Sequence, residues 1–293
     1  KVDISSKDTA MPLSLPRVAV IVIFAMTLIV SGDAAAKVLG GQGFDPVFTA
    51  WSRFALAAII ITPFAGLRRS DIAQAKDWRL VLRAMLIVGG IVCILTALQT
   101  EDMATVFGGF FIGPIVAYVL STILLGEKVT LIRSTLLGLS FIGVLIVIRP
   151  GFGMTTGMGF AILAGCFHGS YLVATRWLAG KVRPRFLLLS QLVIGTIVLA
   201  PFAIGPLPPI TSQATVLIGI SAIGSALGNF LLVVVNRTTP ANVIAPLIYS
   251  QLVSATILGI VVFADWPDKA TLIGLAIITF AGASSVWFAG RDR

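Results

Sequence analysis

The stretch 103–150 constrains the fold more than any other part of this sequence. It contains an apolar run at 103–125, a polar break at Gly126-Glu127-Lys128, and a second apolar run at 131–148. Each run has the length of a helix that crosses a hydrocarbon layer of ~30 Å. The polar break therefore predicts a turn in water between two membrane-spanning helices.

The same pattern returns in the second half of the chain. The alignment that lays Ala104-Thr105-Val106 over Ala241-Asn242-Val243 also lays Ser31-Gly32 over His168-Gly169. Recurrence at a fixed displacement indicates an internal repeat. We call this alignment the repeat register, and it predicts that one unit rich in helical hairpins is written twice.

The whole chain consists of apolar runs of this kind. They predict an all-α membrane protein with ten transmembrane helices at residues 17–38, 46–67, 79–100, 103–125, 131–148, 155–179, 186–204, 212–235, 242–263 and 271–290. Five helices form a first repeat at 17–150 and five form a second at 151–293. The polar segment 1–16 lacks the pattern of a secretory signal, so we expect a short tail.

Composition excludes a water-soluble fold. The chain is 57% hydrophobic and 11% charged, whereas about 25% of the residues in an ordinary soluble domain are charged. The net charge of +9 does not indicate nucleic-acid binding, because the cations lie in short loops rather than along one face. The two cysteines, Cys93 and Cys166, lie inside apolar runs, and with the single His168 they predict no metal site.

The lysines and arginines predict the orientation in the membrane. Most of them fall in loops on the same side as the N-terminus, and the opposite loops carry only Lys37, Arg149 and Lys269. Cytoplasmic loops are enriched in Lys and Arg. We therefore expect a protein of the bacterial inner membrane with both termini on the cytoplasmic side. Because five crossings is an odd number, the second repeat enters from the other side, which makes the repeats inverted. Inverted repeats are typical of secondary transporters that bind substrate near the membrane midplane.

Several motifs resemble a known family. The first repeat carries Gly113-Pro114, the turn Gly126-Glu127, Gly138, Gly143 and Arg149-Pro150, and the second carries Pro246, Gly274 and Gly282. These residues are similar to the EamA branch of the drug/metabolite transporter superfamily, in which an arginine often stands at the position of Arg53. The second repeat departs from the pattern at Asp265 and Gln251. The resemblance implies a ten-helix exporter of small metabolites, most commonly amino acids.

Glycines and prolines predict how the helices pack. Pairs of glycines four residues apart occur at Gly109 and Gly113, Gly165 and Gly169, and Gly224 and Gly228. Such pairs let two helix backbones approach closely in lipid. Pro114, Pro201 and Pro246 interrupt the helical hydrogen-bond ladder, so we expect kinks there.

Charged side chains inside the spans have alternative interpretations. Asp33 lies four residues before Lys37, so the two could pair along the helix, or Asp33 could bind a substrate ammonium or carry a proton. Arg53 could pair with Asp33 or bind a substrate carboxylate. Arg83 is expected to extend to the inner surface.

Polar side chains gather on some helices and are almost absent from 131–148 and 271–290. His168, Tyr171 and Thr175 share one helical face, as do Ser225 and Asn229. Hydrogen bonds between helices, about 0.6 kcal/mol each, are one explanation. The uneven distribution favours a lined cavity, with the substrate-binding candidates Asp33, Thr96, Gln99, His168, Tyr171, Thr175, Ser225, Asn229, Asn242, Tyr249 and Gln251.

The predicted function is export of amino acids or similar small zwitterions by alternating access. Asp33 or helix carbonyls would accept from the ammonium, and the polar candidates on the later helices would donate to the carboxylate. No Walker sequence, HExxH motif or nucleophile elbow occurs, so neither an enzyme nor a cofactor or metal is expected. Two alternatives are an exporter of bulkier organic or sugar-linked solutes and a membrane-integral enzyme built on Glu101-Asp102. The expected partners are a small-molecule substrate and lipid.

Overall fold

The computed structural model describes residues 15–68, 71, 74, 76–126, 131–149, 154–178, 181–238 and 247–289. These residues are helical and contain no strand, which confirms the predicted all-α fold. The helices are α1 (Leu15–Gly41), α2 (Pro46–Ala65), α4 (Trp78–Ala97), α5 (Met103–Phe110), α6 (Gly113–Leu125), α7 (Leu131–Ile148), α8 (Thr156–Leu178), α9 (Pro184–Leu199), the 3-10 helix η1 (Ala200–Phe202), α10 (Ser212–Thr238), α12 (Ser250–Phe263) and α13 (Lys269–Ala289).

These helices account for the ten predicted spans. Among the described residues, seven segments are long and apolar enough to cross a membrane, and three shorter apolar helices lie at Ser134–Ile148, Ser250–Phe263 and Lys269–Ser284. The predicted span 242–263 begins in a part of the chain that lies outside the described residues.

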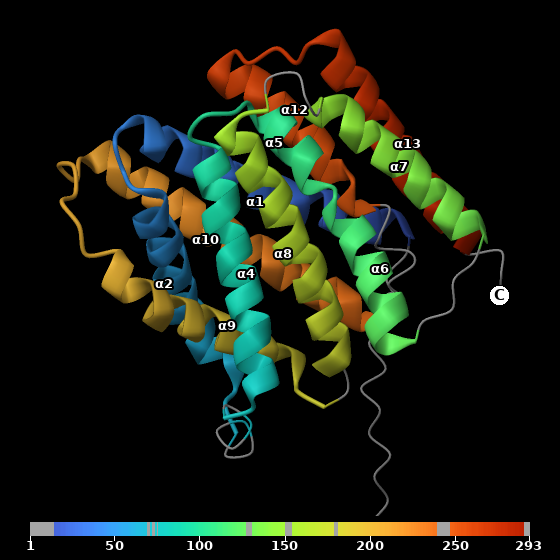
Figure 1. The fold of residues 1–293 in the computed structure, drawn as a ribbon. Helices are drawn as coiled ribbons and strands as arrows, with labels where there is room; N and C mark the ends of the chain where they lie inside the picture. Colours follow the sequence, from blue (N-terminus) through green and yellow to red (C-terminus); the bar gives the residue numbers. More distant parts are fainter. Residues whose placement is uncertain are drawn as a thin grey trace, which may run out of the picture.

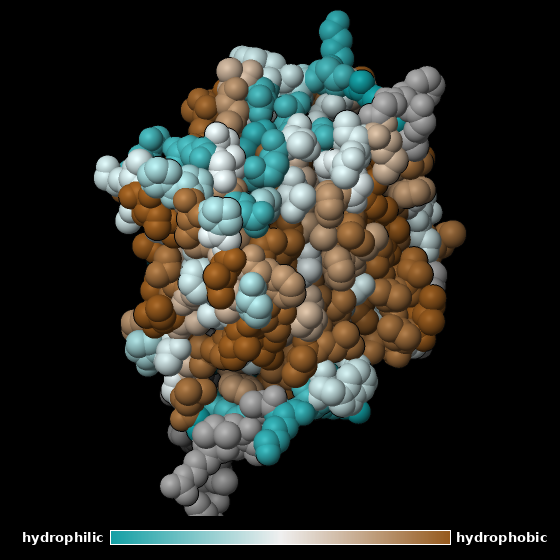
Figure 2. Space-filling view, turned by 60° about the vertical axis from the view of Figure 1, so that its left-hand side comes forward, coloured by the Kyte–Doolittle hydropathy of each residue, from teal (hydrophilic) through white to brown (hydrophobic). Residues whose placement is uncertain are grey.

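The surface of the bundle is suited to lipid. Figure 2 shows a broad hydrophobic band across this face of the molecule, with hydrophilic residues at its two ends. Large apolar side chains on the surface of the bundle, such as Ile123, Val261 and Phe280, are at least 65% exposed. A contiguous exposed apolar surface of this kind belongs in a membrane rather than in water.

The helix ends follow from local turn chemistry. The Asp45 side chain accepts hydrogen bonds from the backbone amides of Val47 and Phe48, and Pro46 occupies the first turn of α2. Gly66 ends the same helix with a left-handed φ of 55°. An aspartate cap, a proline in the first turn and a left-handed glycine are the residues that stop helices in water. They place both ends of α2 at the two polar surfaces.

The helix pairs follow a twofold pattern. α1 packs along α10, and α4 packs along α8. The repeat register relates α1 to α8 and α4 to α10, so these two contacts are equivalent. The helices α2 and α9 correspond to each other and pack together, as do α7 and α13, which lie side by side at one edge of the bundle (Figure 1). The contacts therefore confirm the two inverted five-helix repeats.

The predicted glycine contacts are confirmed. A Cβ atom on Gly224 would lie 2.6 Å from the Leu28 carbonyl oxygen, and a Cβ on Gly228 would lie 2.6 Å from that of Ala25. On α8, a Cβ on Gly165 would lie 2.5 Å from the Phe110 carbonyl oxygen. Only glycine allows these backbones to approach so closely.

The predicted span at 103–125 is present, but where a kink was expected at Pro114 it is divided into the two helices α5 and α6. Ile112 donates its amide to the carbonyl of Gly109, three residues back, instead of four. Pro114 has no N–H and its ring clashes with the preceding turn, so the ladder cannot pass through it. The fourth span therefore consists of two helices that meet at Phe111.

Charged residues cluster at both ends of the bundle. At one end, which we call the Lys37 end, the Lys37 ammonium donates to the Glu101 carbonyl at 2.7 Å and to the Asp265 carboxylate at 3.1 Å. At the opposite end, the Arg183 end, Arg183 donates to the Asp71 carboxylate at 3.0 Å and to the Gly66 carbonyl at 3.0 Å. Each set of contacts joins segments from both repeats.

Asp102 lies near other carboxylates at the Lys37 end, among them Asp265 and Glu101. Desolvation raises the pKa of this carboxyl in the turn between α4 and α5, and the carboxylate of Asp265 raises it further, while Lys37 opposes the shift. An ionised Asp102 therefore opposes folding above its unfolded pKa of 3.8. We expect Asp102→Asn to raise the melting temperature at pH 7 by less than about 2 °C, because the group is partly solvated.

The pH dependence checks this prediction. The advantage of Asp102→Asn should shrink as the pH falls through the raised folded pKa, and it should disappear below 3.8, where the wild-type carboxyl becomes protonated in both states. Asp77→Asn, at the start of α4 and at the opposite end of the bundle, is the control and should gain nothing. Melting curves of the detergent-solubilised protein across this pH range provide the measurement. A gain that does not depend on pH would contradict the electrostatic explanation.

Candidate functional site

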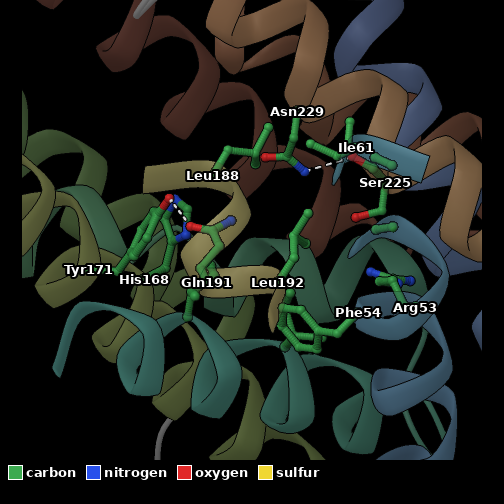
Figure 3. Close-up of a pocket in the computed structure, with 14 residues that line it drawn as sticks. Arg53, Phe54, Ile61, His168, Tyr171, Leu188, Gln191, Leu192, Ser225 and Asn229 are labelled. Carbon is green, nitrogen blue, oxygen red and sulfur yellow. Dashed lines mark hydrogen bonds between the residues drawn. The ribbon is translucent and has the colours of Figure 1, made fainter. Parts of the chain in front are cut away.

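A cavity lies between the two repeats. Its walls come from α2, α4, α8, α9 and α10, which are the second, third, sixth, seventh and eighth spans. Figure 3 shows polar side chains around an apolar floor. The lining residues are Arg53, Phe54, Ala57, Ile61, Ile87, Ile91, His168, Tyr171, Leu188, Gln191, Leu192, Ser225, Ala226 and Asn229.

A buried ion pair stands at one wall, where Arg53 lines the cavity and its partner Asp33 lies behind it, outside the lining. Arg53 Nη1 donates to Asp33 Oδ1 at 2.7 Å, and both side chains are 4% exposed. Arg53 also donates to the carbonyl of Gly32 at 3.0 Å and to the hydroxyl of Ser221 at 3.0 Å and 3.2 Å. The expected pairing of Asp33 with Lys37 is wrong, because Lys37 points to the end of the bundle while Asp33 faces α2.

His168 lies on the cavity as predicted. Its ring centroid is 4.9 Å from that of Phe110 and 5.9 Å from that of Tyr171. Helix α8 brings His168 and Tyr171 to the same face because they are three residues apart. The histidine therefore stands in an aromatic wall, and its neighbours are rings rather than carboxylates.

Tyr171 joins a hydrogen-bond network that reaches across three helices. Its hydroxyl accepts from Arg83 Nη2 at 2.7 Å and donates to Gln191 Oε1 at 3.0 Å. Arg83 also donates to Thr175 Oγ1 at 2.8 Å and to the Leu187 carbonyl at 2.9 Å. The expected extension of Arg83 to the surface is therefore wrong. The guanidinium is held inside the protein by three neutral acceptors, and the residue is 3% exposed.

Ser225 and Asn229 line the cavity from α10. Asn229 Nδ2 donates to the Ser225 carbonyl at 2.8 Å, which fixes the amide against its own helix (Figure 3). Both residues share this lining with Ile61 of α2, the helix on which α10 also packs. Four of the predicted candidates, His168, Tyr171, Ser225 and Asn229, thus meet in one cavity.

Other predicted candidates lie elsewhere. Thr96 donates its hydroxyl to the Val92 carbonyl of its own helix. Gln99 lines a separate hollow at the Lys37 end, where its side chain lies against Gly40. Thr175 contacts Arg83 behind the cavity wall.

The part of the ninth span that the structure describes, from residue 247 onward, does not contribute to the lining of this cavity. Tyr249 packs its ring against Gly282 of α13, with its centroid 5.0 Å from that of Phe111. Gln251 is buried in α12, which packs on α1 and α5 rather than on the cavity. Asn242 lies outside the described residues.

Gln191 lines the cavity although it was not among the predicted candidates. It is 5% exposed, and its carbonyl oxygen accepts from Tyr171. Two signals were available in the sequence. Ser190-Gln191 is a polar pair inside an apolar run, and the repeat register relates it to Arg53-Phe54, which also lines the cavity.

The family follows from both repeats. The EamA-like transporter family matches residues 17–149 and again residues 155–287, which together make up most of the chain. The chain belongs to the EamA-like transporter family. Membership agrees with the ten helices and the two repeats, and it identifies the protein as a multi-pass membrane transporter. Because EamA-like proteins are transporters, membership also supports the prediction that the chain is not an enzyme.

Individual relatives in curated collections are distant. An S-adenosylmethionine uptake transporter of Rickettsia bellii is 24% identical over 260 residues, covering 87% of this chain and 89% of its own. An uncharacterized transporter of Helicobacter pylori is 24% identical over 240 residues, covering 78% and 79%. A solved crystal structure aligns with a TM-score of 0.65 and 17% identity over 94% of this chain and 98% of its own. The last comparison shows a shared fold.

Proposed function

We propose that this EamA-like protein transports small metabolites that carry an α-amino-acid group, with amino acids as the first candidates. The observation that carries the proposal is the cavity between the repeats, which is lined by Arg53 of the first repeat together with Tyr171, Gln191 and Asn229 of the second. Hydrogen-bonding side chains on an apolar floor are the usual composition of a small-molecule site. Alternating access would follow from rocking the two repeats around this cavity.

The proposed direction is export across a bacterial inner membrane with both termini in the cytoplasm. The arginines of the described Arg183 end, including Arg79, Arg183 and Arg185, support this orientation. The sequence contains no Walker motif for binding ATP. The concentration gradient of the substrate, alone or together with a proton gradient, would therefore drive net transport of the substrate. Export then occurs when the cytoplasmic concentration of the substrate is the higher one.

A second candidate is uptake of S-adenosylmethionine, which the Rickettsia bellii relative is named for. This metabolite also contains an α-amino-acid group, so it fits the same chemical class. It carries a net positive charge, however, because its sulfonium and ammonium outnumber its single carboxylate. Among the described charged groups at the cavity and directly behind it, Asp33 is the one acid and it is paired with Arg53, whereas Arg83 adds a second cation. Electrostatics therefore favour a neutral or anionic substrate over this cation.

Counterflow in proteoliposomes tests the proposed function. We expect labelled amino acids to enter vesicles preloaded with unlabelled ones, and labelled S-adenosylmethionine to enter less. Asn229→Leu should reduce counterflow about tenfold or more, because it removes a polar group that would bind the charged ends of the substrate. Thr279→Val on the scaffold helix α13, whose hydroxyl donates to the Leu275 carbonyl, is the matched control and should transport normally.

The same assay separates the candidates. Counterflow of S-adenosylmethionine alone would replace amino acids with the second candidate. Failure of both compounds, with a correctly folded protein, would remove the proposal. Repeating the measurement with a pH gradient shows whether protons are coupled to transport.

A further inference from the structure

Arg83 is a buried cation whose partners are all neutral. Its three hydrogen-bond partners are the Thr175 hydroxyl, the Tyr171 hydroxyl and the Leu187 carbonyl. No described carboxylate lies within ion-pair distance of Arg83, whereas Arg53, which is also buried inside a span, has Asp33. The two arginines are buried to the same degree, so the absence of a carboxylate partner distinguishes Arg83.

An unpaired guanidinium inside a membrane protein is costly. Desolvation of a charge is offset fully only when an opposite charge is nearby. Ionisable residues within transmembrane segments are rare for this reason, and they usually mark sites of function. The protein holds Arg83 rigidly: its guanidinium carbon is 4.7 Å from the Tyr171 ring centroid, which adds a cation–π contact.

A chain of hydrogen bonds connects Arg83 to the cavity. Arg83 donates to the Tyr171 hydroxyl, which donates to Gln191 Oε1, and both Tyr171 and Gln191 line the cavity. Gln191 Nε2 donates to no other described residue. Figure 3 shows Tyr171 and Gln191 pointing toward each other at the edge of the cavity. Because hydrogen bonds in a chain polarise one another, the positive charge strengthens the Gln191 amide as a donor.

We infer that Arg83, Tyr171 and Gln191 form the carboxylate subsite of the cavity. The Gln191 amide donates to the substrate carboxylate, the Tyr171 hydroxyl holds that amide in place, and the substrate supplies the negative charge that Arg83 lacks. The inference rests on the proposed function, and it names the group that every good substrate must carry. A neutral or anionic metabolite with a free carboxylate fits this subsite, whereas the corresponding amide does not.

Matched pairs of ligands test the subsite. Each of the twenty L-amino acids is compared with its own carboxamide as a competitor of counterflow, and by the thermal shift that it produces in the detergent-solubilised protein. We expect the best amino acid to compete about 10–100-fold more strongly than its carboxamide. Equal competition by the acid and the amide in the wild-type protein would overturn the inference.

Two variants connect this preference to the named residues. Arg83→Gln should reduce the preference for acid over amide to less than about threefold, and Tyr171→Phe, which keeps the ring but removes the hydroxyl, should also reduce it. The control is Arg79→Gln, one turn earlier on α4, where the guanidinium lies 4.6 Å from the Trp177 ring centroid and outside the cavity. It removes the same charge and should keep the full preference.

The outcomes distinguish this inference from the proposed function. If the wild-type protein carries no amino acid, both fall. If it carries amino acids and Tyr171→Phe and a folded Arg83→Gln keep the preference, the carboxylate subsite alone is wrong. Should Arg83→Gln fail to fold, Tyr171→Phe and the comparison of acids with amides in the wild type still decide the question.

Discussion

Replacing Asp33 with Asn should destabilise the protein by about 3–5 kcal/mol. The substitution leaves the Arg53 guanidinium buried without its carboxylate, and an uncompensated buried charge carries a penalty of this size. Arg53→Gln should have a similar effect, since it leaves Asp33 unpaired instead. Transport should be lost in both variants, because Arg53 forms part of the cavity wall.

The double variant provides the decisive comparison. Asp33→Asn with Arg53→Gln removes both charges, so we expect it to recover most of the stability that either single variant loses. The free energy of unfolding in detergent micelles is measured for the wild type, the two single variants and the double variant. These four values give the coupling free energy between Asp33 and Arg53. Additive losses would show that the two residues do not depend on each other.

An exposed pair of the same residue types is the matched control. Arg149 and Asp268 form an ion pair at the Lys37 end, with side chains that are 42% and 54% exposed. Solvated pairs contribute about 0–1 kcal/mol, so Asp268→Asn should change stability little at neutral pH. A large effect there would mean that exposure does not explain the difference between the two pairs.

Gly224→Leu should prevent the bundle from forming. A Cβ atom at this position would lie 2.6 Å from the Leu28 carbonyl oxygen, which belongs to the backbone of α1 and cannot rotate away. The contact between α1 and α10 is equivalent to that between α4 and α8, so a shift here also disturbs the twofold arrangement. We expect little folded protein, because overpacking of about 1–3 kcal/mol or more adds to the loss of the close helix contact.

Gly219 on the same helix is the control for this substitution. No atom lies within 4 Å of a Cβ atom built there, so Gly219→Leu adds an apolar side chain in open space. Size-exclusion profiles of both variants after extraction in mild detergent, followed by melting curves, provide the measurement. Normal folding of Gly224→Leu would show that α1 and α10 can separate without cost.

The fold was predictable because lipid imposes a simple rule. Helices must satisfy their own backbone groups, so every long apolar run becomes a helix, and α7 has the predicted bounds 131–148. The break between α5 and α6 was harder to predict, because Pro114 was expected to kink one helix and instead lies in the first turn of a second helix. Whether a proline kinks or ends a helix depends on its neighbours, here the α8 backbone at Gly165.

The part of the candidate site that could be predicted from the sequence is the part in which the spacing of residues along one helix determines which side chains share a face. His168 and Tyr171 share a face, and the structure places that face on the cavity. Thr96 could not be excluded in advance. A threonine whose hydroxyl donates to the backbone of its own helix can stand on any face of that helix, so its polarity does not show whether it lines a cavity. The pairing of Asp33 with Arg53 depends on how two helices meet, whereas proximity along the chain had favoured Lys37.

The link between Lys37 and Asp265 makes the two ends of the bundle unequal. In an inverted repeat, the alternate conformation arises when the two halves exchange roles, so a contact at one end should reappear between equivalent residues at the other. The repeat register carries Lys37 to Ala174, which has no charge to offer. Separation of Lys37 from Asp265 is therefore not replaced by the register-equivalent bond, and the Arg183–Asp71 pair at the opposite end joins other positions of the repeats. The empty carrier should rest with one particular orientation favoured, and this bias is encoded in the chain before any substrate arrives.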